Sequence, residues 1–288
     1  MTTLSDRVLA RLRETAGQPD LAGTRYRLEQ VIGRGGMGAV YAVFDQTLER
    51  RVALKVLTVP DDPARLLAEA RVAAQLEHPG VMPLYDVGTL GDGRPYYTMK
   101  LVEGMHLDEF ARQNTSLSDR LRVFQKLCDA VAYAHSRGVV HRDLKPANVM
   151  VGPFGEVLVM DWGIGVAGTP RYRAPEQATP NADRGEVGPA ADVHALGVIL
   201  RALLPGDAPK PLGAVAGRAT ASSPADRYPD AGSLNREIGR YLDGGSVEAY
   251  RESFVERAVK FYRSNQPLLI LLLVYIIVRF ALFFWPGR

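Results

Sequence analysis

Residues 141–150, HRDLKPANVM, place an acid, two bases and an amide directly before an apolar run. The acid is Asp143, the bases are Arg142 and Lys145, and the amide is Asn148. It needs an explanation why opposite charges lie so close together beside residues that are typical of a hydrophobic core. Ten residues cannot supply it, so the flanking sequence has to decide what this stretch does.

The composition is that of an ordinary globular protein. The chain has 288 residues, 47% of them hydrophobic and 23% charged, which allows one large or two medium domains. A net charge of +3 is too small to indicate nucleic-acid binding. The lone cysteine, Cys128, excludes an internal disulfide and fits a reducing compartment. Five scattered histidines give no zinc-ligand spacing.

The first hundred residues have mostly strand character. Residues 25–59 alternate between apolar and polar positions on both sides of a glycine-rich turn, and residues 93–102 form another strand-like run. Residues 63–77 have helical periodicity with a proline at the first turn. This part therefore predicts a small sheet with one helix.

Beyond residue 104 the pattern becomes helical. Residues 117–138 predict a long amphipathic helix, which Ser116 or Ser118 could cap and Gly138 would close. Residues 191–204 predict a buried helix, 205–211 a loop, and 222–242 a turn followed by a short helix. The fold class is therefore α+β.

The glycine-rich turn fits the pattern G-x-G-x-x-G. Alone this is weak evidence, because a Rossmann turn has the same pattern. A Rossmann turn opens a helix, however, whereas residues 39–45 are strand-like. Lys55 follows in an apolar strand, which argues against a solvated strand end. A glycine hairpin lets backbone amides approach phosphates closely, and such a lysine adds a point charge. The glycines concerned are Gly33, Gly35, Gly36 and Gly38.

Residues 24–243, about three quarters of the chain, resemble a bacterial eukaryotic-like (Hanks-type) serine/threonine protein kinase. Five elements match in order, and they include the opening stretch. They are the glycine loop, VALK at 52–55, Glu69, HRDLKPAN at 141–148 and DWG at 161–163. The resemblance implies a bilobal protein-kinase-like fold, with a small β-rich N-lobe over 24–99 and a larger helical C-lobe over 100–243.

The resemblance also assigns roles in phosphoryl transfer. Asp143 would accept or orient the proton of the acceptor hydroxyl, and Lys145 would neutralise the transferred group. Asn148 and Asp161 would hold Mg²⁺, with Mn²⁺ as an alternative. The nucleotide would be ATP, contacted by apolar side chains and by the hinge backbone. Those contacts would come from Val40, Ala53, Met99, Leu101 and Met150.

Other positions have structural roles by the same resemblance. Glu69 would pair with Lys55; the alternative is a solvent-facing helix acid. His141 reads as a packed core histidine. Glu176 and Arg227 would form a buried ion pair in the C-lobe, Asp192 would bind the backbone of the catalytic loop, and Arg142 would normally hold a phosphorylated activation loop. The remaining four histidines suggest no chemistry.

Three features depart from the family pattern. Trp162 replaces the usual phenylalanine, and its indole N–H needs a partner when buried. Only residues 164–173 separate DWG from APE, with hydroxyls at Thr169 and Tyr172 alone. Thr169 would bond Asp143 and Lys145, so we expect phosphorylation of this loop to have little or no switching role. Residues 205–223 also look too short for the family's usual docking helix.

The C-terminal part predicts a membrane anchor. Residues 267–285 are almost wholly apolar, and residues 268–285 as a helix would span roughly 27 Å. The alternative is a buried core helix. Residues 244–266 predict a basic amphipathic helix, either on the headgroups or as a strut. The excess of bases before the span predicts a single pass through the inner (cytoplasmic) membrane, with the kinase part in the cytoplasm. An N-terminal extension over 1–23, which does not resemble a signal peptide, and a tail over 286–288 complete the chain.

Two functions follow from these features. The first is an active kinase that transfers the γ-phosphate of ATP to Ser/Thr hydroxyls of proteins, with a homodimer for trans-phosphorylation as a further expectation. The second is a catalytically silent, nucleotide-binding pseudokinase scaffold at the membrane. The retained polar residues favour the first, and the shortened segments motivate the second. A kinase for a small molecule is a third option.

Overall fold

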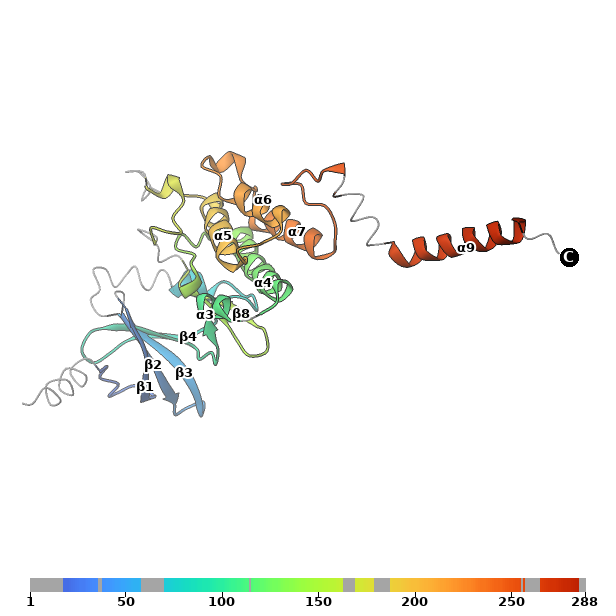
Figure 1. Ribbon diagram of the computed structural model, residues 1–288. Helices are drawn as coiled ribbons and strands as arrows, with labels where there is room; N and C mark the ends of the chain where they lie inside the picture. The colour runs from blue at the N-terminus through green and yellow to red at the C-terminus, as the bar shows by residue number, and fades with distance from the viewer. Residues whose placement is uncertain are drawn as a thin grey trace, which may run out of the picture.

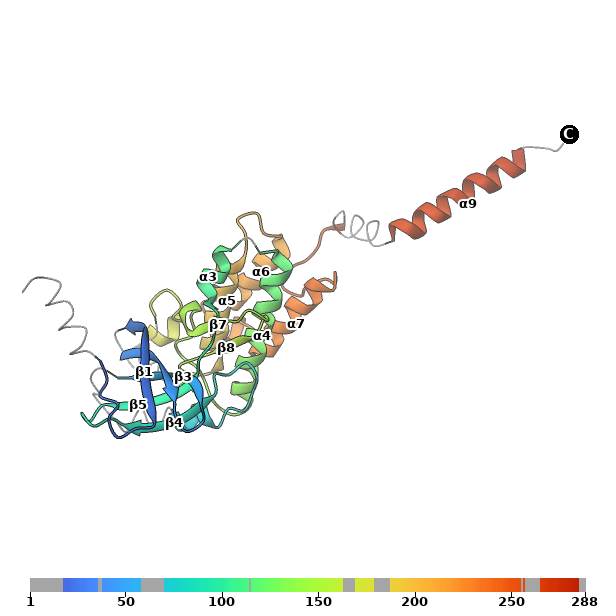
Figure 2. The ribbon, with the colours of Figure 1, turned by 90° about the horizontal axis from the view of Figure 1, so that it is seen from below.

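The computed structural model describes residues 18–35, 38–57, 70–113, 115–162, 169–178, 187–254, 256 and 265–284, the side chains of 267–269 and 281–284 excepted. These residues form a small sheet-based lobe, a larger helical lobe and one helix that extends away from both (Figure 1, Figure 2). The predicted bilobal α+β fold is confirmed.

The N-lobe is built on a five-stranded antiparallel sheet in the order β1-β2-β3-β5-β4. Alternating residues such as Tyr41, Val43, Val52 and Leu54 are buried on one face, which is why the period-2 pattern of the sequence predicts these strands. The predicted helix over 63–77 is described only from residue 70, and residues 70–74 are helical. The strands are β1 (Tyr26–Gly35), β2 (Gly38–Asp45), β3 (Arg50–Val56), β4 (Leu84–Thr89) and β5 (Pro95–Lys100).

One glycine of the hairpin between β1 and β2 cannot be replaced without strain. Gly38 pairs with Gly35 across the hairpin and has φ of +146°. A Cβ atom at residue 38 would collide with the backbone carbonyl of Val56 on β3. Glycine is therefore required by both the backbone conformation and the close approach of the next strand.

In the described residues of the C-lobe, α4 (Leu117–Ser136) packs together with three other longer helices. The N-cap of α4 is Ser116 and not Ser118, because the Ser116 hydroxyl accepts a hydrogen bond from the N–H of Asp119. A small sheet beneath the cleft carries the catalytic loop. The remaining elements are α3 (Leu107–Arg112), α5 (Pro189–Leu203), α6 (Lys210–Ala219), α7 (Ala231–Leu242), β6 (Met105–His106), β7 (Val149–Val151) and β8 (Val157–Val159).

The connection after α5 corrects the predicted loop. Helix α6 begins at Lys210, inside the predicted loop over 205–211, because Pro211 occupies its first turn without losing a helical hydrogen bond. Its apolar face, with Leu212, Val215 and Ala216, is fully buried. This helix packs against α5 and α7, so it serves the core and does not project as a docking helix.

The segment after α7 differs from the predicted helix over 244–266. Residues 244–253 form turns and irregular structure, and Val247 and Tyr250 pack against the C-lobe core. Helix begins only at residue 254, where Ser253 and Glu256 exchange side-chain to backbone hydrogen bonds as a capping box. The rest of the predicted helix is largely outside the described residues. Tyr250 therefore does not share a helical face with Phe254, which is 86% exposed.

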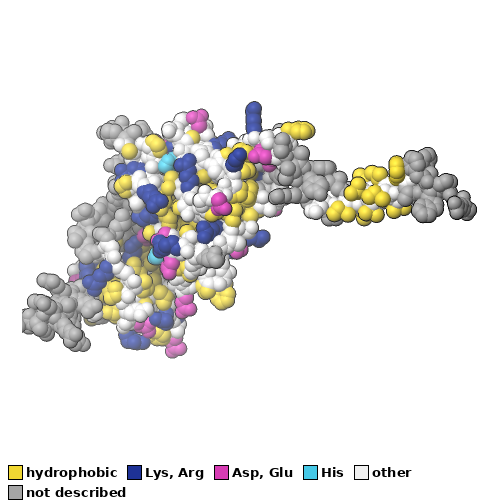
Figure 3. Space-filling view, viewed as in Figure 1, with side chains coloured by type: hydrophobic (Ala, Val, Ile, Leu, Met, Phe, Trp, Pro, Cys, Tyr) yellow, Lys and Arg dark blue, Asp and Glu magenta, His cyan; other side chains and the backbone are white. Residues whose placement is uncertain are grey.

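Helix α9 (Gln266–Phe284) extends away from both lobes. Its described side chains from residue 270 to 280 are all exposed and mostly apolar. Apolar side chains cover much of the face of this helix that Figure 3 shows. Judged on the described residues alone, no helix has the length and apolar character that a membrane crossing requires. The predicted transmembrane helix over 267–285 is therefore not confirmed.

Candidate active site

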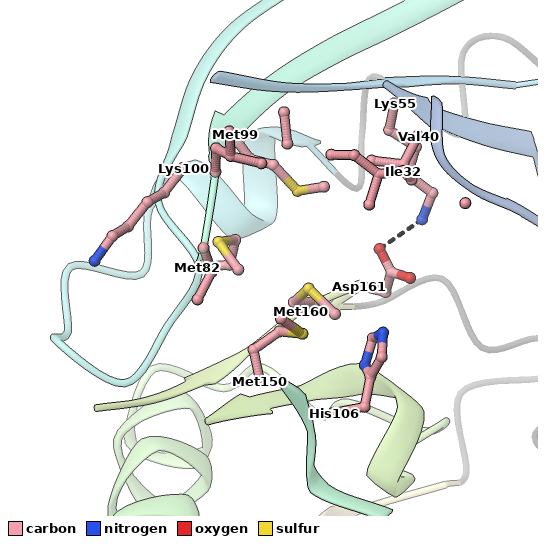
Figure 4. Close-up of a pocket in the computed structure, with 14 residues that line it drawn as sticks. Ile32, Val40, Lys55, Met82, Met99, Lys100, His106, Met150, Met160 and Asp161 are labelled. Atoms are coloured by element: carbon pink, nitrogen blue, oxygen red, sulfur yellow. Dashed lines mark hydrogen bonds and ion pairs between the residues drawn. The ribbon is translucent and has the colours of Figure 1, made fainter. Parts of the chain in front are cut away.

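A cavity of about 200 Å³ lies between the two lobes (Figure 4). The predicted adenine contacts Val40, Ala53, Met99, Leu101 and Met150 all line it, as does Gly33. The thioethers of four methionines gather there, and such polarizable groups suit the faces of an aromatic ring. The hinge residues predicted to offer backbone groups to adenine, 100–102, form one wall.

Several lining residues were not predicted. Ile32, Met82, Met160 and His106 also face the cavity. Ile32 directly precedes the glycine loop, and Met160 directly precedes Asp161. Both residues could therefore have been predicted from their positions next to predicted site residues. His106, for which the sequence suggests no chemistry, lines the cavity from β6, and its imidazole points toward it. Gly35 and Gly38 sit at the hairpin turn, while Gly36 lies outside the described residues.

At the phosphate end of the cavity, Lys55 and Asp161 form an ion pair. Lys55 Nζ is 2.6 Å from Asp161 Oδ1, and the Tyr97 hydroxyl donates to the same oxygen at 3.1 Å. Burial alone would raise the pKa of the Asp161 carboxyl, but the charge and hydrogen bond of Lys55, with the Tyr97 hydroxyl, hold that pKa below its ordinary value. Asp161 is thus an anion facing the cleft. The Lys55–Asp161 pair was not predicted from the sequence, and Glu69, the predicted partner of Lys55, lies outside the described residues.

The catalytic loop presents a second charged cluster. Lys145 Nζ donates to Asp143 Oδ2 at 2.6 Å and to Thr169 Oγ1 at 2.9 Å. The Thr169 hydroxyl and backbone N–H both donate to Asp143 Oδ1, at 3.0 and 2.7 Å. The predicted contacts of Thr169 are therefore present. They fix the Asp143 carboxylate on both oxygens.

The catalytic loop is mounted on α5 through a buried carboxylate. Asp192 accepts backbone hydrogen bonds from His141 at 2.7 Å and Arg142 at 2.9 Å, as expected for a residue that binds this loop. His135 Nε2 lies 2.9 Å from Asp192 Oδ2, a contact that was not predicted. Burial acts to raise the pKa of Asp192, but the hydrogen bond of His135 and the two nearby imidazoles hold that pKa below its ordinary value.

His141 and Trp162 fill the space beneath the site. His141 is fully buried and its ring centroid is 4.8 Å from that of Trp162, which confirms the prediction of a packed core histidine. The indole N–H of Trp162 donates to the carbonyl of Val159 at 3.1 Å, which supplies the partner it needed. Arg142 and Asp161 have positive φ of 67° and 59°, and such strained backbone commonly clusters at functional sites.

Replacing Asp192 with asparagine should change the acid sensitivity of the fold. Because the folded pKa of Asp192 is depressed, its stabilising contribution is present above its unfolded pKa of about 3.9 and is lost as pH falls through the lower folded pKa. Asp192→Asn should lower the free energy of unfolding at neutral pH by about 1–3 kcal/mol. The loss of stability between about pH 5 and about pH 3 should also be shallower than in the wild type. Urea unfolding across this range measures both effects.

The matched control is Asp129→Asn, which alters an exposed acid of α4 that accepts a hydrogen bond from Asn235. That variant should follow the wild-type pH curve. If Asp192→Asn also follows the wild-type curve, Asp192 does not carry the assigned acid sensitivity.

The site has oxygen donors suited to a hard divalent cation. The Asn148 side-chain N–H₂ donates to the carbonyl of Asp143 at 2.8 Å, which turns the amide oxygen away from that carbonyl. Within the described part of the chain, no hydrogen bond engages Asp161 Oδ2. One carboxylate and one amide fit Mg²⁺, which is usually held by few protein ligands together with phosphates and water. The described residues contain no group of three or more His, Cys, Asp or Glu side chains arranged around a metal position.

The predicted ion pair of the C-lobe is present. The Arg227 guanidinium binds both oxygens of Glu176, at 2.6 and 2.8 Å, and also three backbone carbonyls. The Arg227 side chain is completely buried. Burial acts to raise the pKa of Glu176, but the Arg227 hydrogen bond outweighs it and holds that pKa below its ordinary value.

The architecture is that of a protein kinase. A strand-rich lobe and a helical lobe enclose a cleft, and this cleft holds a lysine–aspartate pair. Residues 26–222 match the family model described as "Protein kinase domain". The chain belongs to the protein kinase family. The relatives named below are bacterial serine/threonine-protein kinases, which agrees with a kinase of the Hanks type.

Relatives and a solved structure agree with this placement. Serine/threonine-protein kinase PknD of Chlamydia muridarum is 30% identical over 327 aligned residues, covering 85% of this chain and 34% of the relative. PknD of Protochlamydia amoebophila is 35% identical over 241, covering 66% and 24%. The chain therefore spans about a third or less of the length of these relatives. The kinase domain of Mycobacterium tuberculosis PknI superposes with a TM-score of 0.63 at 28% identity, over 77% of this chain and 98% of that one.

Proposed function

We propose that the protein is an active serine/threonine kinase that transfers the γ-phosphate of ATP to Ser/Thr hydroxyls of protein substrates. The observation that carries this proposal is the arrangement of two charged clusters at one cleft. Lys55 is paired with Asp161 at the end of the nucleotide cavity, and Lys145 is paired with Asp143 on the catalytic loop. A catalytically silent relative has no need to keep both pairs with this geometry.

Each cluster has a chemical task in this mechanism. ATP with bound Mg²⁺ supplies the phosphoryl group and much of the charge neutralisation. Asp161 and Asn148 would hold the cation, and Lys55 would add positive charge beside the phosphates. Asp143 accepts or orients the proton of the acceptor hydroxyl. Lys145 lies within hydrogen-bond reach of Asp143, so its positive charge would neutralise the phosphoryl group as this group passes to the acceptor hydroxyl.

Phosphate transfer can be measured directly. The purified chain, incubated with γ-³²P-ATP and Mg²⁺ and a general acceptor such as myelin basic protein, should label serine and threonine but not tyrosine. Lys55→Met is the control and should abolish labelling. Nucleotide binding without transfer, in a folded wild-type chain, would instead favour the pseudokinase scaffold. The packing of α6 against α5 and α7, which leaves no projecting helix in this described stretch, supports that second function. If the protein binds nucleotide and phosphorylates a small alcohol but no protein, the result would favour a kinase for a small molecule.

We further propose that residues 267–285 hold the protein at the inner membrane, with the kinase lobes in the cytoplasm. This proposal rests on the apolar sequence of these residues and on the exposure of the described side chains of α9, such as Leu271 at 72%. Exposed apolar surface of this extent needs a cover. Two copies held in one membrane would also meet more often, which favours trans-phosphorylation in a homodimer.

Deleting residues 264–288 tests the membrane proposal. The shortened protein should move from the membrane fraction to the soluble fraction and keep its kinase activity, because the deletion leaves both lobes intact. A shortened protein that still sediments with membranes would show that another part of the chain holds it there.

A further inference from the structure

Tyr97 joins the N-lobe sheet to Asp161 at one end of the cleft. It lies on β5, where the register of the sheet places it directly opposite Lys55 of β3. Its side chain is buried, with 5% of the residue exposed. Its hydroxyl donates to Asp161 Oδ1 at 3.1 Å, the oxygen that also binds Lys55 Nζ at 2.6 Å. Two neighbouring strands therefore direct two donors at one oxygen of one carboxylate.

The two donor side chains, Lys55 and Tyr97, differ in flexibility. A lysine is a flexible four-carbon stem with rotatable donors, so it can follow a carboxylate that turns. A buried tyrosine has a rigid ring, and its hydroxyl position is fixed once the ring is packed. Lys55 Nζ also lies 5.7 Å from the centroid of the Tyr97 ring, so the ring borders the lysine as well.

The backbone at Asp161 makes a fixed side-chain contact valuable. Asp161 has φ of 59°, a conformation that non-glycine residues rarely adopt and that no regular element imposes here. The described contacts that hold the carboxylate in its direction are those with Lys55 and Tyr97. With Oδ1 held by Tyr97 and Lys55, Oδ2 is the oxygen left for a cation, since no described residue donates a hydrogen bond to it.

We propose that Tyr97 is a positioning residue that fixes the Asp161 carboxylate so that Oδ2 faces the cation of the nucleotide complex. The inference rests on the proposed function for its setting, because it presumes that a divalent cation binds at Asp161. It assigns to the tyrosine hydroxyl a role separate from the charge of Lys55. A lysine alone would leave the carboxylate free to rotate about its ionic partner.

The test compares Tyr97→Phe with Tyr96→Phe. Both variants remove one hydroxyl from β5, but Tyr96 lies on the opposite face of the sheet, in the cluster with Tyr26 and Leu90. The probe is Mn²⁺, titrated into the ADP complex and followed by electron paramagnetic resonance. Tyr97→Phe should raise the apparent dissociation constant for Mn²⁺ by about tenfold or more, the scale at which groups supporting a metal ligand act. Tyr96→Phe should leave that constant within about twofold.

Two further readouts separate positioning from structural damage. The midpoint of thermal unfolding without metal and the affinity for ADP without metal should be unchanged in Tyr97→Phe, because the ring remains. Tyr97→Met is the second variant, and it should weaken Mn²⁺ binding as well. Unchanged Mn²⁺ affinity in both Tyr97 variants overturns the proposal, and so does an equal loss in Tyr96→Phe. Since the measurement uses ADP, it gives an answer even if phosphate transfer to proteins is never observed.

Discussion

Replacing Asp143 with asparagine is expected to lower kcat by about 10²–10⁴-fold and to leave nucleotide affinity nearly unchanged. The carboxylate accepts from Lys145 on Oδ2 and from the N–H and hydroxyl of Thr169 on Oδ1. Asparagine has the same shape but cannot take up a proton, and its N–H₂ group would face a donor on either side. Steady-state kinetics with a protein acceptor measure kcat, and calorimetry with ADP measures nucleotide affinity.

The control for this substitution is Asp108→Asn on α3. Asp108 is exposed and pairs with Arg112 one helical turn away, far in sequence from the catalytic loop. That variant should have wild-type kcat. If the folded Asp143→Asn protein keeps more than about a tenth of wild-type kcat, Asp143 is not the proton acceptor.

The sequence predicted those parts of the molecule that depend on local pattern. The strands around the glycine hairpin follow from alternation, and Gly38 is required where a side chain would strike the next strand. The polar residues of the catalytic loop lie within a few positions of one another, so a single stretch of sequence brings Asp143, Lys145 and Asn148 together. Chain neighbours that share a tight loop need little tertiary information to be placed.

Contacts set by tertiary packing were missed. Tyr97 reaches Asp161 only because of the register between β3 and β5, which the sequence alone does not specify. His135 reaches Asp192 only because α4 and α5 pack side by side in the C-lobe. In both pairs the two residues are more than fifty positions apart, and neither Tyr97 nor His135 belongs to one of the motifs recognised in the sequence.

Periodicity also misled where packing overrode it. Tyr250 and Phe254 are spaced as on one helical face, yet residues 244–253 lie against the C-lobe without forming a helix. Burial of Val247 and packing of Tyr250 stabilise this irregular path. Glu237 contributes by accepting a hydrogen bond from the N–H of Ala249. Tertiary contacts of this kind outweigh the modest intrinsic preference for helix.

Replacing Arg227 with methionine is expected to lower the free energy of unfolding by about 3–5 kcal/mol. The guanidinium is fully buried and uses its donors on both oxygens of Glu176 and on the carbonyls of Ala190, Ala221 and Ser222. Methionine fills much of the volume but leaves a partly buried carboxylate and three carbonyls without their donor. Urea unfolding at neutral pH, followed by circular dichroism, measures the loss.

The comparison that isolates burial is Arg112→Met. Arg112 also pairs with a carboxylate, Asp108, but both side chains are largely exposed. Exposed pairs at this helical spacing contribute about 0.3–0.5 kcal/mol, so this variant should unfold close to the wild-type midpoint. Because Arg227 connects the segment after DWG to α5 and to the turn before α7, its loss should also lower kcat through misplacement of Thr169. Equal stability of the two variants would mean that the buried guanidinium does not hold these three segments together.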